Sequence, residues 1–140
     1  MNSFTSLSAR FYSLFAVTLA LISFQAAAFG GDIYVVTSSG LTISAEEVKD
    51  IFVGDKQVEG GVKLTPIDNA SLKAEFLEKA LHMTPEKYTS LWGKKVFRDG
   101  LIPPVTKAND LEIIALIKAK PGTVGYVSTV SGDVRIITKY

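Results

Sequence analysis

The fold is decided by residues 62–76, VKLTPIDNASLKAEF, which join a strand pattern to a helix pattern. Residues 63–67 predict a short strand, a polar turn begins at Asp68, and an amphipathic helix follows. In an open α/β sheet, the turn between a strand and the next helix is the usual position of a ligand crevice. Free N–H groups at the start of the helix favour an anion there. The sequence therefore predicts a site for a small anion at this turn.

Residues 1–28 differ in composition from the rest of the chain. Arg10 is their only charged residue, residues 11–24 form a largely apolar run, and three alanines end the block at Ala28. This pattern is typical of a secretory signal peptide that is cleaved near Ala28, and an uncleaved membrane anchor is the alternative. The apolar run is shorter than the ~20 residues that span a bilayer, which favours cleavage. The sequence therefore predicts export.

Outside that block the chain is formally neutral, because the whole sequence has a net charge of +1 and Arg10 lies inside the block. Neutrality argues against a nonspecific nucleic-acid-binding protein. The sequence has no cysteine and one histidine, His82, which argues against thiol catalysis and most zinc sites. We therefore predict one non-catalytic domain over residues 29–140, with no metal and no cofactor.

The rest of the sequence alternates strand and helix patterns. Strands are expected at residues 32–37, 63–67, 123–128 and 134–138, helices at 45–53, 70–81, 85–97 and 110–119, and an extended segment at 101–105. Helix starts are marked by Ser44 with Glu47, Thr84 with Pro85, and Asn109 with Glu112. The order β-α-β-α-α-α-β-β predicts a small α/β domain with a parallel core sheet and right-handed crossovers.

Several short motifs resemble, in the same order, the substrate-binding proteins for phosphate uptake by ABC transporters. They are LTIS at 41–44, IFVG at 51–54, PID at 66–68, FL at 76–77, Trp92, Phe97, Gly100, PP at 103–104 and PGTVGYV at 121–127. The likeness covers residues 32–128 and resembles the small, stand-alone exported domains of Gram-negative bacteria. It implies a type 2 periplasmic binding protein architecture and a periplasmic location. Since the chain is too short for two lobes, it implies a single lobe with a small, mostly parallel sheet flanked by helices.

In the phosphate-binding members, an arginine in this turn and a Ser-Gly-Thr at the helix start hold the oxyanion. The matching positions here carry Asp68 in place of the arginine, and only Ser71 matches the Ser-Gly-Thr group. A carboxylate repels phosphate and removes a bidentate donor. The ligand-binding candidates of this chain are Asp68, Asn69 and Ser71, together with Ser38, Ser39 and Thr42, which are expected at the same edge of a parallel sheet. For all of them the competing interpretation is a turn or helix cap without a ligand.

A basic stripe is expected on the helix at residues 85–97. Lys87, Lys94, Lys95 and Arg98 recur there at helical spacing. One interpretation is a solvated helix face, and the other is a patch for an acidic partner or for anionic lipid headgroups.

These features favour an exported solute-binding-protein-like domain that binds phosphate or another small oxyanion weakly, or has lost this binding. An ABC permease or another envelope protein is the expected partner. The alternative function is a periplasmic protein–protein interaction module, which uses the surface that a missing lobe would cover and can pair with itself as a homodimer.

Overall fold

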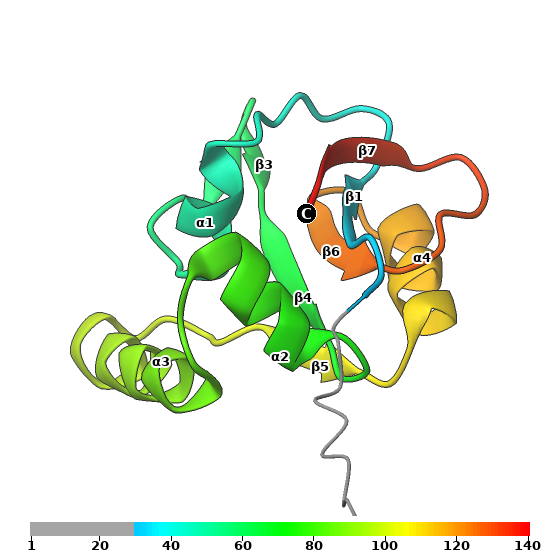
Figure 1. Cartoon of the computed structure of the whole chain (residues 1–140). Helices are drawn as coiled ribbons and strands as arrows, with labels where there is room; N and C mark the ends of the chain where they lie inside the picture. The colour runs from blue at the N-terminus through cyan, green and yellow to red at the C-terminus, as the bar shows by residue number, and fades with distance from the viewer. Residues whose placement is uncertain (1–29) are drawn as a thin grey trace, which may run out of the picture.

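The computed structural model describes residues 30–140, which form a five-stranded sheet with helices on both faces and a separate short hairpin (Figure 1). The elements are β1 (Tyr34–Thr37), α1 (Glu47–Phe52), β2 (Val58–Glu59), β3 (Val62–Lys63), β4 (Thr65–Asn69), α2 (Lys73–Phe76), η1 (Leu77–Leu81), α3 (Pro85–Asp99), β5 (Val105–Lys107), α4 (Asp110–Ala119), β6 (Thr123–Val127) and β7 (Arg135–Lys139). The predicted signal peptide, residues 1–28, lies outside the described residues. Within residues 30–140, no helix combines the length and the apolar character needed to cross a membrane.

The sheet has the strand order β5-β4-β6-β1-β7. Strand β4 pairs in parallel with both β5 and β6, whereas β1 pairs antiparallel with both β6 and β7. Because β1 is reversed relative to both of its neighbours, β7 runs in the same direction as β6, and β1 is the one reversed strand of this sheet. The predicted class, a single α/β lobe with a mostly parallel sheet between helices, is confirmed.

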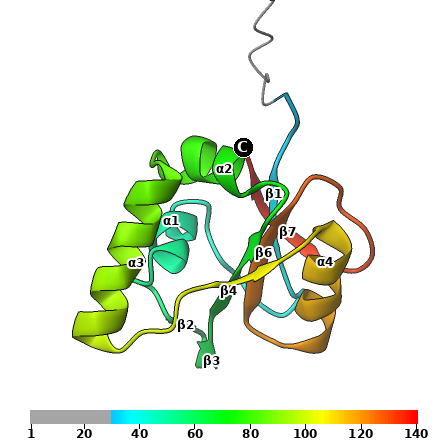
Figure 2. The ribbon, with the colours of Figure 1, turned by 90° about the horizontal axis from the view of Figure 1, so that it is seen from below.

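Two hydrophobic cores lie on opposite faces of the sheet, because successive strand side chains alternate between the faces. On one face, α1 and α2 supply Phe52 and Phe76, and the Phe76 ring stacks on Tyr126 with 3.8 Å between ring centroids. On the other face, α4 packs on β4 and β6. Figure 2 shows α3 and α4 on opposite sides of the sheet. Gly125 permits close packing of α4, since a Cβ there would lie 2.5 Å from Ile113 Cγ2.

The helix after β4 differs from the expected continuous α-helix over residues 70–81. It begins at Lys73, keeps α-helical hydrogen bonding to Phe76 and continues as the π-helical turn η1. The late start has a local cause: the Asn69 side chain accepts the N–H two residues later, which folds residues 69–71 into a turn. At the other end, His82 adopts a left-handed conformation with φ 55° and ends the helical segment.

The two predicted N-caps of the longer helices are confirmed. Thr84 Oγ1 accepts the N–H of Lys87 at 3.2 Å at the start of α3. Asn109 Oδ1 accepts the N–H of Glu112 at 3.1 Å at the start of α4. The proline-containing segment between these helices leads into β5, a short edge strand that the sequence did not indicate. Strand β5 adds a third parallel strand end beside the predicted site.

Candidate functional site

The candidate residues Asp68 and Asn69 lie at the end of β4, and the sheet separates their side chains. Strand alternation points Asp68 toward α2 and α3, and points Asn69 toward α4. Both side chains are buried, with exposed fractions of 1% and 0%. The predicted turn therefore divides into two polar groups on opposite faces of the sheet.

Asn69 is the centre of the group on the α4 face. Its side-chain Nδ2 donates to Asp110 Oδ1 at 2.7 Å and to the carbonyl oxygen of Tyr126 at 3.0 Å. Its Oδ1 accepts from Ser71, from the backbone N–H at 3.2 Å and from the hydroxyl at 2.7 Å. For Asn69 and Ser71 the turn interpretation thus explains their contacts without a ligand, since Asn69 Oδ1 accepts both donors of Ser71 and Asn69 Nδ2 donates to Asp110 and Tyr126.

The carboxylate of Asp110 occupies a cradle of donors at the same edge. Its Oδ2 accepts from the Ser128 N–H at 2.9 Å, the Ser128 hydroxyl at 2.7 Å and the Thr129 N–H at 3.0 Å. Burial raises the pKa of the Asp110 carboxyl, but the hydrogen bonds that it accepts outweigh this effect and hold the pKa below its ordinary value. A cluster of N–H and O–H donors around one oxygen is the arrangement that binds an oxyanion. Here the oxyanion is a side chain of the protein itself.

Sequence reasoning missed Asp110 and Ser128 as parts of this edge. Asp110 is the first residue of α4 and follows β5, whereas Ser128 directly follows β6. Both β5 and β6 are parallel to β4, so their carboxyl ends meet at one edge of the sheet. The signal that could have found the pair is an aspartate after one parallel strand and a Ser-Thr pair after another. Recognising it required β5, which the sequence did not indicate.

Asp68 is the centre of the group on the other face. Its Oδ1 accepts from the Tyr126 hydroxyl at 3.2 Å and lies 3.5 Å from the Tyr88 hydroxyl. Lys73 Nζ lies 3.2 Å from Oδ2, within ion-pair distance. Burial raises the pKa of the Asp68 carboxyl above its ordinary value, and the lysine and the two hydroxyls oppose this shift. Burial and the nearby carboxylate raise the pKa of both tyrosines, so their hydroxyls remain protonated donors.

The capping interpretation is wrong for Asp68. Within residues 30–140, its carboxylate oxygens contact side chains of α2, α3 and β6, and α2 begins without a side-chain cap. A buried carboxylate is costly to desolvate unless it is paired and hydrogen bonded. Asp68 is therefore a buried, ion-paired carboxylate and not the N-cap of α2.

The prediction that Ser38, Ser39 and Thr42 share this edge is wrong. They follow β1, and β1 is antiparallel to β6 with Thr37 opposite Val124. Val124 also aligns with Pro66, near the beginning of β4. The three residues therefore lie at the opposite edge of the sheet from Asn69. The physical reason is the reversal of β1, which no local pattern reveals.

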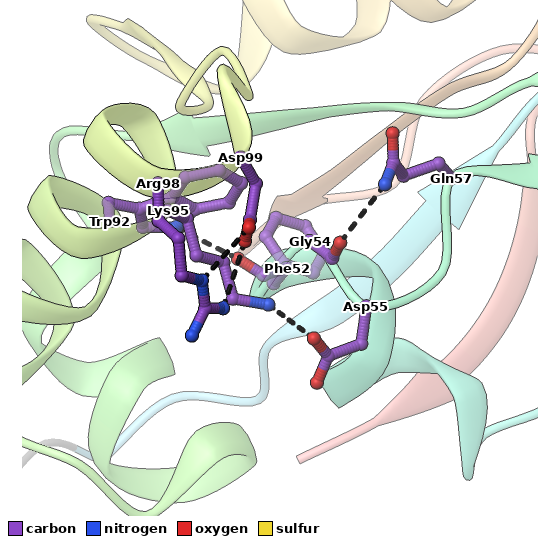
Figure 3. Close-up of polar contacts among 8 residues, drawn as sticks. All are labelled: Phe52, Gly54, Asp55, Gln57, Trp92, Lys95, Arg98 and Asp99. Carbon is purple, nitrogen blue, oxygen red and sulfur yellow. Dashed lines mark hydrogen bonds and ion pairs between the residues drawn. The ribbon is translucent and has the colours of Figure 1, made fainter.

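The basic stripe exists on α3, but two of its members already have acidic partners (Figure 3). Lys95 pairs with Asp55, and Arg98 pairs with the neighbouring Asp99 through two contacts of 2.9 Å. The four basic side chains, Lys87, Lys94, Lys95 and Arg98, line one shallow groove together with Ser90 and Leu91. The structure brings them together as predicted, and the pairing lowers the net positive charge of the stripe.

Trp92 anchors α3 to the rest of the domain beside this stripe. Its Nε1 donates to the Phe52 carbonyl oxygen at 3.2 Å (Figure 3). The Tyr88 hydroxyl donates to the same oxygen at 3.2 Å. Gly54, with φ 79°, lies under the indole, where a Cβ would be 2.7 Å from Trp92 Cη2.

Within residues 30–140, no group of three or more His, Cys, Asp or Glu side chains is arranged to hold a metal ion.

Comparisons with known proteins identify the fold. No protein-family model and no curated protein matches the chain. Among solved structures, an ABC-type phosphate transport receptor from Vibrio cholerae is similar, with a TM-score of 0.52 and 15% identity, over 76% of this chain and 46% of that chain. The chain has a phosphate-receptor-like fold. PstS from Borrelia burgdorferi matches with a TM-score of 0.49 and 17% identity, over 69% of this chain and 41% of that one. This chain spans less than half the length of either protein.

Proposed function

We propose that this chain is a non-catalytic periplasmic domain with the fold of a solute-binding protein, in which the binding of free phosphate is weak or lost. The observation that supports this function is the Asp110 carboxylate, which accepts the N–H and hydroxyl groups of Ser128 and the N–H of Thr129. An oxyanion that bound to these donors would have to displace an internal anion. The internal carboxylate has the advantage because it is part of the fold and loses no translational freedom on binding.

Electrostatics at the strand ends support the same function. Asp68 lies near the end of β4, and Asp110 contacts Asn69 at that end, so one carboxyl group lies on each face of the sheet. The Vibrio cholerae receptor is a phosphate transport protein; a phosphate that entered at the same sheet edge of this chain would meet negative charge. Lys73, on the Asp68 face, is already paired with Asp68 at 3.2 Å. The carboxyl groups on the two faces of this strand end therefore oppose the binding of phosphate.

Calorimetric titration with phosphate and sulfate tests the proposal. We expect no saturable heat from the wild-type protein at millimolar anion, and a gain of weak binding in Asp110→Ala, whose donors are released. Glu112→Ala is the matched control, because it removes a carboxylate from the same helical turn without touching Ser128 or Thr129. Micromolar phosphate binding by the wild-type protein would overturn the proposal.

If the domain does not bind a free anion, its proposed role is to bind another protein. The class of partner that we propose is an ABC permease or another envelope protein. The second candidate, self-association as a homodimer, is favoured by two apolar side chains near the end of α3. Phe97 is 94% exposed and Ile102 is 79% exposed, which is unusual for such large side chains that lie close together in the chain. Light scattering over a range of protein concentrations decides between a monomer and a dimer. A strict monomer at high concentration eliminates the homodimer.

A further inference from the structure

Helix α3 is attached to the domain along a narrow face. Two of its fifteen side chains, Tyr88 and Trp92, are buried, and both donate to the Phe52 carbonyl oxygen. Figure 2 shows the helix along one side of the domain, with its outer face turned away from the other described elements. This outer face of α3 is therefore open to a partner.

Basic side chains predominate on the outer face of α3. The helix contains four basic residues and two acidic ones. At 3.6 residues per turn, Lys87, Lys94 and Arg98 lie within about 40° of one another around the helix axis. Within residues 30–140, no acidic side chain lies within ion-pair distance of Lys87 or Lys94. These two ammonium groups therefore carry uncompensated positive charge.

A large apolar side chain lies beside these cations. Phe97 is 94% exposed, and it follows Lys94 by three residues, so the two are neighbours on the helix surface. Val96 is 44% exposed, and Ile102, just after the helix, is 79% exposed. A protruding aromatic ring next to unpaired cations is suited to a partner that is negatively charged at its surface and apolar below it.

We propose that the outer face of α3 binds the surface of an anionic lipid bilayer. The Phe97 ring inserts at the boundary between the headgroups and the acyl chains, and the helix lies along the surface. Lys87 and Lys94 reach the lipid phosphates on their flexible side chains. Lys87 and Arg98 are eleven residues apart, roughly 16 Å along the helix, so the basic residues contact several lipids at once.

The composition of this face favours a lipid surface over an acidic protein. Protein interfaces have an apolar core from which lysine and serine are depleted. Here lysines and Ser90 line the groove, and Phe97 protrudes at its end. A fluid lipid surface does not require a fixed set of partner groups, because each lysine can find a phosphate. Free phosphate offers no apolar layer for Phe97.

The inference deepens the proposed function, because an ABC permease or another envelope protein lies in or beside such a membrane. It rests on the proposed export of the chain. Phosphate titration tests the strand ends, whereas vesicle binding tests α3. The two experiments therefore fail independently.

Co-sedimentation with lipid vesicles tests the proposal. The protein is residues 29–140, which omit the apolar run of the predicted signal peptide. We expect at least about tenfold stronger partition to phosphatidylcholine vesicles with about 30% phosphatidylglycerol than to pure phosphatidylcholine, since each basic residue near an anionic surface contributes about fivefold. Most of this binding should disappear in about 0.5 M salt. Equal partition to the two vesicles, or none to either, overturns the proposal. Binding of soluble polyglutamate without vesicle binding also overturns it and indicates an acidic protein.

Two lysine variants connect the charge dependence to α3. Lys87→Gln/Lys94→Gln removes both uncompensated charges and should weaken partition to the anionic vesicles by about tenfold or more. Lys118→Gln/Lys120→Gln is the matched control, because it removes two exposed lysines at the end of α4, on the other side of the sheet. Unchanged partition in the α3 variant, or an equal loss in the control, overturns the assignment to α3.

A second pair of variants tests the insertion of Phe97. Phe97→Gln keeps a good helix former and should weaken partition several-fold. Leu111→Gln is its control, because Leu111 is 76% exposed and lies on α4. If Phe97 serves self-association alone, Phe97→Gln keeps its vesicle binding. That result, or an equal loss in Leu111→Gln, overturns the insertion of this ring.

Discussion

Replacing Asp110 with asparagine tests the internal carboxylate, because the side chain keeps its size and loses its charge. The wild-type carboxylate accepts one hydrogen bond from Asn69 and three from the turn at residues 128–129. Asparagine has a single acceptor oxygen, so its own NH2 group must then face one of these donors. Hydrogen bonds to charged groups contribute about 1.5–3 kcal/mol each, and neutral ones about 0.5–1.5 kcal/mol. Since the carboxylate is partly exposed, we expect a loss of about 2 kcal/mol in the free energy of unfolding.

The pH dependence of this loss identifies its cause. The pKa of Asp110 is lower in the folded protein than its ordinary value, so its stabilisation is present above that ordinary value and disappears as the pH falls through the folded-state pKa. The difference between the wild-type protein and Asp110→Asn should therefore shrink toward zero in acid. Urea unfolding, followed by the fluorescence of the single tryptophan, measures it at neutral and acidic pH.

Glu112→Gln is the matched control for Asp110→Asn. Glu112 lies in the same first turn of α4, and its carboxylate accepts one exposed hydrogen bond, from Ala108 N–H at 3.2 Å. We expect its loss to cost less than about 1 kcal/mol. The reasoning is refuted if Asp110→Asn unfolds at the same urea concentration as the wild-type protein at neutral pH, or if the two variants lose equal stability.

Three further predictions concern stability, and urea unfolding measures each of them. Asp68→Asn should raise the free energy of unfolding at neutral pH by about 1 kcal/mol. Burial raises the pKa of the Asp68 carboxyl, so ionisation of Asp68 destabilises the fold as the pH rises above the ordinary pKa of an aspartate. A less stable variant at neutral pH would contradict this. Gly122→Ala should cost about 2 kcal/mol or more, since φ is 86° and a Cβ would lie 2.0 Å from the Lys63 carbonyl oxygen. Gly40→Ala is the control and should change stability by less than about 0.5 kcal/mol, because the space around Gly40 is open. Equal losses in the two variants would refute the predicted clash at Gly122. Asn69→Ala should cost about 2 kcal/mol, because Asp110, the Tyr126 carbonyl oxygen and Ser71 each lose the hydrogen-bond partner that Asn69 supplies, and Asn69 is itself fully buried. An unchanged free energy of unfolding would contradict this role of Asn69.

Local features of the structure were predictable from sequence because their causes are local. The caps at Thr84 and Asn109 depend on residues three positions apart, and both form as expected. The apolar spacing of α4 predicts a buried face of Leu111, Ile114, Ala115 and Ile117. Ile114 and Ile117 lie in the core, whereas Leu111 and Ala115 are exposed and Ile113 is buried instead. The order of such elements predicted the α/β class, and the single lobe followed from the family resemblance and the length of the chain.

The reversed direction of β1 could not be predicted, because its partners lie far away in the chain. β1 pairs with β6 and β7, which begin at Thr123 and Arg135. A buried strand has the same apolar pattern in either direction, so the sequence of β1 carries no sign of its orientation. Because β1 is antiparallel to β6, Ser38, Ser39 and Thr42, which follow β1, lie at the opposite edge of the sheet from the one predicted.

The candidate site was predictable in position and only partly in chemistry. The sequence located Asp68, Asn69 and Ser71 at the end of β4, where the structure has them. It could not assign the contacts of Asp68, because those depend on Tyr88 and Tyr126, which come from distant elements. The same holds for Asp110, whose donors follow β6.

The most direct test of the occupied cradle is a phosphate titration followed by two-dimensional NMR of the backbone amides. The Ser128 and Thr129 N–H groups donate to Asp110 at 2.9 and 3.0 Å, so their signals report any anion that replaces the carboxylate. We predict that both signals stay in place as phosphate is added at neutral pH, and that both move when Asp110 is protonated in acid. A saturable shift of these two amides with phosphate at neutral pH would contradict the central claim that the protein fills its own anion site.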